Sequence, residues 1–367
     1  ETEEQEEDDE DGVNLGNLIY CDAHCHLDYC ILNDKHGDDV WTFKKWMCPR
    51  WKDDGWCPLG GSCDYAHGEA ELYRREPLRA EDLEPFVQRH FAGRSARQDQ
   101  IAATPRAACF IHNCCELEAI EDARLIAEVS EQMLGGTVFC TFGCHPHNYT
   151  DYDDLMEQRL LAAFKACGRK AVAWGECGLD YYKNFYDAEY PEKRACMVNV
   201  FARQARLAAS LGIPLVVHTR DAEEDTIAVL RESLPSSHPV HIHAFQGSVA
   251  LTQQVLHMLP NSVIGISGVI AMKYVDEHMR DLTRAIPLDR LVLETDAPYL
   301  SEEPNEIPKI ARAVAKLKGV TTGEVLSATA ENCMRLYNIS PPAAAAAEHA
   351  SAAGTGSAEA DSGKRTA

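Results

Sequence analysis

The stretch LIYCDAHCH at residues 18–26 joins an apolar run directly to two closely spaced histidines. Its first part, residues 18–21, is rich in the residue types that favour β-strands. Because side chains two positions apart on an extended chain point to the same side, His24 and His26 can reach one metal ion together. Such a pair also occurs on protein surfaces and in cores. The apolar run followed by the two histidines predicts a strand that ends in side chains able to bind a metal.

Seven further short apolar runs follow, with helix-length amphipathic segments between them. The predicted strands after 18–21 are residues 107–111, 138–142, 171–174, 215–217, 240–242, 263–266 and 291–293. The predicted helices include residues 117–134, 154–166, 189–211, 226–234 and 248–259. Repeated alternation of strand and helix predicts an α/β fold, a parallel TIM (β/α)8 barrel. A doubly wound open sheet shows the same alternation and is the alternative.

Metal-competent side chains stand at the C-terminal ends of five of these predicted strands. They are His24, His26, Glu176, His218, His243 and Asp296. In a parallel barrel all C-terminal strand ends meet at one face, which is where barrel enzymes place their chemistry. Six nitrogen and oxygen ligands are too many for one tetrahedral ion and suit two divalent cations, Mg, Mn or Zn, that share a carboxylate. We expect Asp22 and Asp180 to orient the ligand imidazoles.

The composition excludes several classes of protein. The chain has 367 residues, 45% of them hydrophobic and 25% charged, which is the balance of a globular protein rather than a disordered or fibrous one. Its net charge of −23 excludes a general DNA-coating role, so nucleic acid must bind at a local site or through metal ions. No apolar run is long enough for a membrane span, and the N-terminal residues lack the apolar core of a secretory signal.

Both ends of the sequence have the composition of disordered tails. Nine of the first eleven residues are acidic, and residues 341–367 are rich in Ala, Ser and Gly without large apolar residues. We expect disordered tails over 1–16 and 341–367, with the barrel over 17–340. The 15 cysteines are predicted to be reduced core thiols plus a metal site, which favours the cytoplasm or the nucleus.

The alternation is interrupted after the first predicted strand. Residues 31–80 hold four of the five tryptophans and show little periodicity, so we predict an insertion in the first βα loop. Within it, four residues follow the spacing C-x8-C-x5-C-x3-H, namely Cys48, Cys57, Cys63 and His67. Three thiolates and one imidazole form a closed tetrahedral zinc site, and zinc supplies the folding energy that so short a segment lacks. We therefore predict one structural Zn in a small domain over 41–70.

Six motifs in the predicted barrel carry a resemblance to a known family. They are DAHCH (22–26), GCHPH (143–147), GECGLDYY (175–182), PLVVHTRDA (214–222), HAFQGS (243–248) and ETDAPY (294–299). In these motifs and their order the chain resembles the TatD family of metal-dependent deoxyribonucleases, within the amidohydrolase-like barrels. The resemblance covers the whole predicted barrel. It implies a TIM-type fold, two divalent cations and hydrolysis of phosphodiester bonds in DNA, by an endonuclease or a 3′-to-5′ exonuclease.

The family pattern also implies roles for individual residues. The ligand sets it implies are His24, His26 and Asp296 for the first ion, and His218 and His243 for the second, with Glu176 bridging both. Asp296 would also accept the proton of the attacking water. His145 and His147 would contact the scissile phosphate or protonate the leaving alkoxide, with a purely structural role as the alternative. Arg220 would hold a phosphate or pair with a neighbouring Asp.

The sequence departs from the family pattern at two places. Ala244 stands where the family often has Cys, and His241 lies two residues before His243 as an alternative ligand. Phe245 and Gly247 keep the register that favours His243. The second departure is the insertion, whose cysteine and histidine spacing resembles the CCCH zinc-finger family.

The CCCH resemblance implies binding of single-stranded RNA, with aromatic rings stacked between bases. The candidate rings are Trp51, Trp56 and Tyr65. Residues 41–75 hold six basic and five acidic side chains, a near-neutral balance that predicts weak electrostatic attraction for nucleic acid. A structural finger, which caps the barrel or contacts protein, is the alternative.

We expect a two-metal nuclease that acts on DNA, with a finger that presents nucleic acid. Another metal-dependent hydrolase on the same barrel, such as a ribonuclease or a D-aminoacyl-tRNA deacylase, is the first alternative, because fold alone does not decide the reaction. Small-molecule amidohydrolases often bridge their metals with a carbamylated Lys, whereas this chain supplies Glu176. A non-catalytic RNA-binding adaptor is the second alternative; it predicts lost ligands, whereas all six are present.

Overall fold

The computed structural model describes residues 15–36, 47–60, 63, 65–72, 75–92, 105–133, 137–182 and 190–340. Both predicted tails lie outside this set, except for the last two residues of the N-terminal one. Those two, Leu15 and Gly16, belong to a one-turn helix, η1 (Leu15–Asn17), and the Leu15 side chain is buried. Leu15 is therefore not part of a solvated tail.

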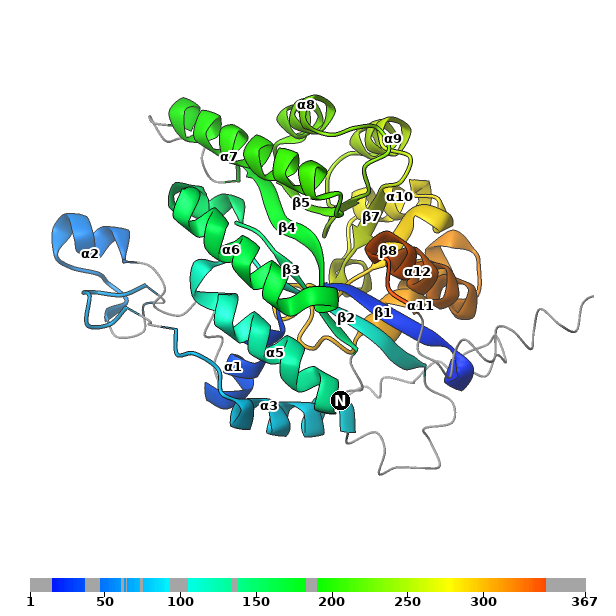
Figure 1. The fold of residues 1–367 in the computed structure, drawn as a ribbon, viewed down its shortest axis with the longest axis horizontal. Coiled ribbons are helices and arrows are strands. Elements are labelled where there is room, and N and C mark those ends of the chain that lie inside the picture. The colour runs from blue at the N-terminus through cyan, green and yellow to red at the C-terminus, as the bar shows by residue number, and fades with distance from the viewer. Residues whose placement is uncertain are drawn as a thin grey trace, which may run out of the picture.

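Eight parallel strands form one sheet in chain order (Figure 1). Their bounds are β1 Ile19–Cys25, β2 Arg106–Cys114, β3 Val138–Phe142, β4 Ala171–Asp180, β5 Leu215–Arg220, β6 Val240–Ile242, β7 Val263–Ile266 and β8 Leu291–Leu293. The two edges meet, since the N–H of His26 donates to the carbonyl of Ala297 at 2.8 Å. The predicted (β/α)8 barrel is confirmed. The open-sheet alternative is wrong, because its strand order would reverse at a switch point.

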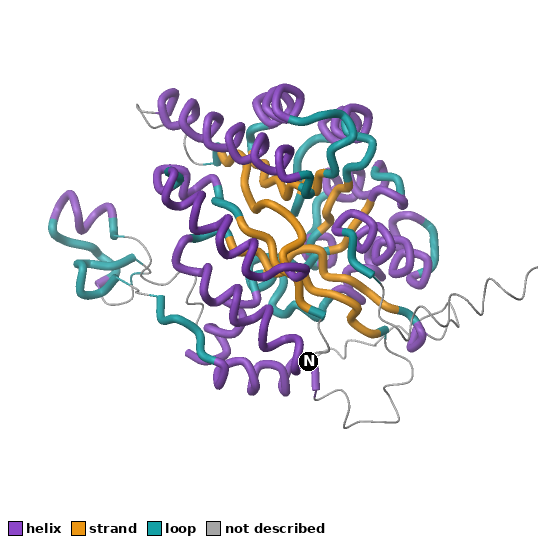
Figure 2. The backbone as a smooth tube through the Cα atoms, viewed as in Figure 1, coloured by secondary structure: helices purple, strands orange, loops and turns teal. Residues whose placement is uncertain are grey.

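Helices surround the sheet on its outside, apart from α2 (Pro49–Asp54), which projects away from it (Figure 2). They are α1 Leu27–His36, α2 Pro49–Asp54, α3 Ala80–Val87, α5 Ile120–Met133, α6 Asp154–Cys167, α7 Tyr190–Leu211, α8 Glu223–Ser233, α9 Val249–Met258, α10 Glu277–Ala285, α11 Ile307–Lys318 and α12 Thr322–Tyr337. The short turns are η3 Gln88–Ala92, η4 Leu117–Ala119, η5 Pro146–Asp151, η6 Gly168–Lys170, η7 Gly268–Ala271 and η8 Leu288–Arg290. Side-chain oxygens of Asp153, Ser248, Asp276 and Thr321 accept from backbone N–H groups three residues on, which explains where four of these helices begin.

The core has two layers because alternate strand residues point to opposite faces. On β2, Phe110 packs into the large layer between the strands and the helices. Its neighbours Cys109 and Ile111 belong to a smaller cluster with residues of β1, β4, β5, β7 and β8 and of α12. This smaller cluster fills the barrel below the strand ends that carry the predicted ligands.

Four strands have the predicted bounds, namely β3, β6, β7 and β8, and the other four extend beyond them. The extensions contain polar motif residues, as in β4, where Glu176 and Asp180 continue the strand and are buried. The predicted strands are too short because an apolar run is the only sequence signal used for a strand, and polar residues interrupt such a run. In the folded chain the barrel encloses these side chains, and the backbone hydrogen bonds between neighbouring strands continue through these residues.

The predicted insertion over 31–80 has the wrong boundaries. α1 runs to His36, and its residues Ile31 and Leu32 are 3% and 0% exposed in the barrel core. Leu78 and α3 return to the same core. Because α1 is buried at six successive positions, 27–32, it shows no helical periodicity in sequence. The inserted segment therefore lies between His36 and Leu78, and α2 within it projects away from the barrel (Figure 1).

Candidate metal centre

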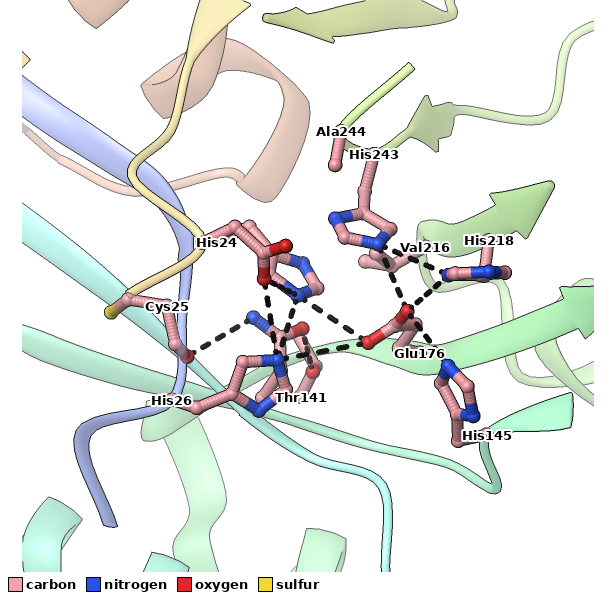
Figure 3. A network of polar contacts seen from close by, with 12 residues as sticks. His24, Cys25, His26, Thr141, His145, Glu176, Val216, His218, His243 and Ala244 are labelled. Atoms are coloured by element: carbon pink, nitrogen blue, oxygen red, sulfur yellow. Dashed lines mark hydrogen bonds and ion pairs between the residues drawn. The ribbon is translucent and has the colours of Figure 1, made fainter. Parts of the chain in front are cut away.

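Glu176 lies at the centre of a buried polar cluster where the strands end (Figure 3). It belongs to β4, and its two oxygens face different histidines. Oε2 lies 3.4 Å from His24 Nε2, whereas Oε1 lies 2.8 Å from His218 Nδ1 and 2.9 Å from His243 Nε2. The carboxylate therefore stands between two groups of imidazoles.

The first group consists of His24, His26 and Asp296. The end of β1 carries both histidines, whose Nε2 atoms are 3.3 Å apart. Asp296 Oδ1 lies 3.6 Å from His24 Nε2 and 3.5 Å from His26 Nε2. Asp296 takes a φ of 50°, a left-handed conformation that is unfavourable for a residue with a Cβ. Strain of this kind is typical of functional positions.

The second group consists of His145, His218 and His243 around Glu176 Oε1. The β5 residue His218 lies 3.4 Å from His243, measured from Nδ1 to Nε2. His145 follows β3 and places its Nε2 3.6 Å from Glu176 Oε1. The ligand atoms of His145, Glu176 and His218 all lie within 4.8 Å of one another. The strand-end position of His145 was the sequence signal for this placement.

His147 adjoins the second group, and its backbone N–H donates to His145 Nδ1 at 3.1 Å. Its Nε2 is 3.0 Å from Asp180 Oδ2, and its side chain is 56% exposed. Asp180 also lies 3.2 Å from His218 Nε2 and accepts from the N–H of Tyr182 at 2.9 Å. Asp180 thus has the orienting contact expected of it. His147 stands at the solvent side of the cluster.

Asp22 does not orient an imidazole ring, contrary to the prediction. Its oxygens accept from the hydroxyl of Thr295 at 2.5 Å and from the N–H of Thr295 at 3.0 Å. Thr295 immediately precedes Asp296, so Asp22 joins β1 to the segment that carries this carboxylate. The pairing connects opposite edges of the sheet, which local sequence spacing does not reveal.

His241 lies outside both groups. Its Nδ1 is 2.7 Å from the hydroxyl of Tyr337, and its Nε2 is 3.0 Å from Glu294. All three side chains are buried. In a continuous strand, His241 and His243 would point to the same side, because residues two apart do so. The strand β6 ends at Ile242, however, and the turn that follows places His243 beside Glu176.

Burial and neighbouring charges set the protonation of the cluster. Burial opposes charge on Glu176, yet the imidazoles of His243 and His145 hold the pKa of its carboxyl well below the usual value. Burial and the neighbouring His243 lower the pKa of His24 to about 3. Glu176 is therefore ionised and His24 neutral, the forms in which these groups bind cations, whereas the carboxylate raises the pKa of His243 in the metal-free chain.

The residues present fit divalent cations. Asp296 Oδ1 is buried and has no hydrogen-bond partner, although it faces two imidazoles. Ligand atoms of His24, His26 and Asp296 all lie within 4.8 Å of one another, as do those of the other triads around Glu176. Imidazole and carboxylate donors suit Zn, Mn or Mg, and a buried unpaired oxygen among them is explained by a bound cation.

A second cluster lies in the inserted segment. The ligand atoms of Cys48, Cys57, Cys63 and His67 lie within 4.8 Å of one another. The N–H of Cys48 donates to the carbonyl of Ala66 at 2.8 Å, which holds the first ligand beside the segment that carries the last. Gly55 ends α2 with a φ of 65°, a conformation that glycine adopts without strain. His67 Nε2 is buried without a hydrogen-bond partner, as expected of a nitrogen that faces a metal.

The three candidate stacking rings of the finger differ in exposure. The Trp51 ring stacks on His67, with ring centroids 4.6 Å apart and 10° between the planes. It is 36% exposed, against 62% for Trp56 and 45% for Tyr65. One face of Trp51 thus covers a zinc-ligand candidate, and Trp56 and Tyr65 offer more surface for a base.

Comparison with known proteins decides the family. A family model described as TatD related DNase matches residues 85–338, which is more than half of the chain. The chain belongs to the TatD-related DNase family. A model of the C-x8-C-x5-C-x3-H zinc finger matches residues 47–69, so this TatD-family chain carries a CCCH finger between β1 and β2 of its barrel.

Relatives of known name include nucleases of both nucleic acids. The human 3′-5′ RNA nuclease TATDN2 is 34% identical over 243 residues, which cover 62% of this chain and 30% of the human protein. The 3′-5′ ssDNA/RNA exonuclease TatD of Erwinia tasmaniensis is 36% identical over 211 residues, 54% of this chain and 78% of that protein. The chain thus spans under a third of its human relative. A TatD family hydrolase structure from Entamoeba histolytica has a TM-score of 0.61 at 19% identity, covers 88% of this chain and 98% of that chain, and shows the same fold.

Two other features complete the description of this TatD-family chain. All 15 cysteines are free. In the part of the chain that the structure describes, no helix combines the length and apolar character needed to span a bilayer.

Proposed function

We propose that this chain hydrolyses phosphodiester bonds of DNA at a two-cation centre in the barrel, with Glu176 shared between the cations. One observation carries the proposal, namely that Glu176 Oε2 faces His24, whereas Oε1 faces His218 and His243. His24, His26 and Asp296 would hold one cation. His218 and His243, whose ring nitrogens are 3.4 Å apart, would hold the other, with His145 beside them. Two such cations, Mg, Mn or Zn, would activate a water and neutralise the charge of the phosphate.

The chain's own side chains supply the proton transfers. Asp296 belongs to the first ligand set, so its carboxylate would lie beside the attacking water and could accept its proton. His147 is the exposed imidazole of the cluster, and Asp180 holds its Nε2 at 3.0 Å. An imidazole so placed can donate a proton to the leaving alkoxide or a hydrogen bond to the phosphate.

The finger would hold a structural Zn and present single-stranded nucleic acid, DNA or RNA, to the barrel. Among its described residues, Trp56 and Tyr65 have the more exposed rings. The acidic net charge leaves stacking and metal contacts as the main sources of affinity. Reduced thiols throughout the chain suit the cytoplasm or the nucleus.

The test uses end-labelled single- and double-stranded DNA and RNA, with and without Mg²⁺ or Mn²⁺. We expect metal-dependent shortening of DNA, and loss of that activity in Asp296→Asn. Glu192→Gln, an exposed change on α7, is the control and should retain activity. Failure of the wild-type chain to cleave any of the four substrates with either metal contradicts the proposal.

Ribonuclease action is the second candidate, favoured by the name of the human relative. The same assay separates the two, because cleavage of RNA with DNA left intact would replace the first candidate by the second. Product lengths distinguish an exonuclease from an endonuclease.

A further inference from the structure

Three buried cysteines form a cluster that neither the barrel centre nor the finger uses. Cys21 lies in β1, Cys109 in β2 and Cys333 in α12. Their Sγ atoms all lie within 4.8 Å of one another, and the side chains are 3%, 0% and 0% exposed. The cluster therefore gathers three soft donor atoms in a dry part of the barrel.

The fold explains why these residues meet. Cys21 and Cys109 are register partners in the β1–β2 ladder, so their side chains lie on the same face. α12 packs against β1 and brings Cys333 to them, with 4.0 Å between the Sγ atoms of Cys109 and Cys333. Cys21 precedes His24 by three residues, which places it about 10 Å further down the strand at ~3.3 Å per residue. The cluster is thus separate from the carboxylate and imidazole centre.

We infer that Cys21, Cys109 and Cys333 bind one soft monovalent cation, Cu(I), in a three-coordinate site. Sulfur donors select soft cations of this type. Three sulfur atoms around one cation, with bonds of about 2.3 Å, lie about 4 Å apart. The 4.0 Å separation of Cys109 Sγ and Cys333 Sγ has this value before any metal is bound.

The number of ligands distinguishes Cu(I) from zinc. Within the described ranges, no fourth histidine, cysteine or carboxylate atom joins the group. Structural zinc sites have four ligands, as in the finger. A site of three sulfur atoms enclosed by apolar side chains suits a cation that is stable with three ligands.

The test measures Cu(I) retention by the full chain in the absence of oxygen, against a chromophoric Cu(I) chelator. Cys48→Ala, Cys57→Ala and Cys63→Ala are introduced first, so that the finger does not contribute. We expect one tightly held copper per chain, with three sulfur neighbours by X-ray absorption, and a higher Tm with copper. Adding Cys109→Ala and Cys333→Ala should abolish all three effects.

The matched control adds Cys140→Ala and Cys177→Ala, two other fully buried cysteines of the barrel. This variant should keep its copper. Equal copper retention by the two double variants would overturn the inference. Copper with nitrogen and oxygen neighbours and an unchanged Tm would also overturn it, because it would mean adventitious ions only. A disulfide between the peptides of Cys109 and Cys333 in the protein as purified would also overturn it. X-ray absorption on the unmutated cluster keeps the test valid if the double variant does not fold.

Discussion

The N–H of Asp296 donates to the carbonyl oxygen of His24 at 2.9 Å. His24 lies near the end of β1, and Asp296 follows β8. Because β1 and β8 are the first and last strands of the sheet, this hydrogen bond marks the closure of the barrel. The same closure brings Asp296 Oδ1 to 3.6 Å from His24 Nε2. The candidate metal centre therefore exists only when the barrel is closed, and metal affinity and folding stability should be linked.

Replacing Glu176 by Gln should remove the shared charge and leave the fold intact. We expect the number of bound divalent cations to fall and kcat on DNA to drop by more than about 100-fold, beyond the 10–100-fold typical of outer-shell partners. Metal analysis and oligonucleotide cleavage measure the two effects. The exposed-site variant Glu192→Gln should behave as wild type. Wild-type turnover by Glu176→Gln would contradict the role of this residue.

Metal affinity should fall as the pH is lowered. Burial disfavours a charged His243, but the Glu176 carboxylate raises the pKa of this histidine to about 10 in the metal-free chain. Below that pH a cation must displace a proton from His243, and the displacement becomes harder as protons become more concentrated. Calorimetric titration with Mn²⁺ in buffers of different ionisation enthalpy should show net proton release. Binding without proton release would argue against His243 as a ligand.

A buried ion pair ties the chain that returns from the finger to the barrel. Arg75 Nη2 lies 2.6 Å from Asp28 Oδ2 and 2.8 Å from Asp122 Oδ2, and all three side chains are at most 4% exposed. Arg75→Ala leaves two buried carboxylates without their cation. We expect it to lower the free energy of unfolding by ~3–5 kcal/mol, measured by urea denaturation. Arg124→Ala, an exposed pair with Glu121, should cost less than ~1 kcal/mol.

The effect of Arg75→Ala should depend on pH in a defined direction. Although burial opposes the charge, Arg75 lowers the pKa of Asp28 from 3.8 to about 2. A depressed carboxyl pKa contributes stability above its unfolded value and loses it as the pH falls toward the folded value. The difference between wild type and variant, measured with chelator present, should therefore shrink from pH 4 to pH 2. Burial raises the pKa of Asp122, and Arg75 holds it down, so protonation of Asp122 in the variant reinforces this trend. A difference that grows on acidification would contradict the assigned role of Arg75.

Gly178 allows β4 and β5 to approach closely beside His218. A Cβ at this position would overlap the carbonyl oxygen of His218, and its φ of +150° is itself unfavourable for other residues. Gly178→Ala should cost ~1–3 kcal/mol of stability through overpacking and weaken binding of the second cation. Gly212→Ala is the control, because its φ of +66° is also positive but open space surrounds it. Thermal unfolding and metal titration compare the two. Equal effects of both changes would exclude the steric argument.

The finger should act on long substrates and leave small ones unaffected. Cys57→Ser removes a zinc ligand candidate and should unfold the finger. If Trp56 and Tyr65 each stack on a base at ~1–3 kcal/mol, KM for oligonucleotides should rise roughly 30-fold or more. Cleavage of bis-p-nitrophenyl phosphate should be unchanged.

The control for the finger is Cys196→Ser, which changes the exposed cysteine of α7. This variant should retain the wild-type KM. An unaltered KM in Cys57→Ser would instead assign the finger to protein contacts or to stability.

Much of the barrel and its centre was predictable because the signals are local. Each strand contains an apolar run, and each ligand candidate lies within five residues of the end of such a run, as His218 follows residues 215–217. Parallel topology then requires all strand ends to meet at one face, so the cluster followed from chain order. The finger was predictable for a similar reason, since its four ligands lie within twenty residues at a fixed spacing.

Tertiary structure alone decided which of these side chains contact one another. It placed His145 with Glu176 and moved His147 to Asp180, although the two histidines are separated only by Pro146. It paired Asp22 with Thr295 across the closed barrel and assembled the thiols of Cys21, Cys109 and Cys333. These contacts join residues far apart in the chain or depend on the turn after a strand. The sequence by itself determined which residue types stand at each strand end, whereas register and barrel closure determined which of their atoms meet.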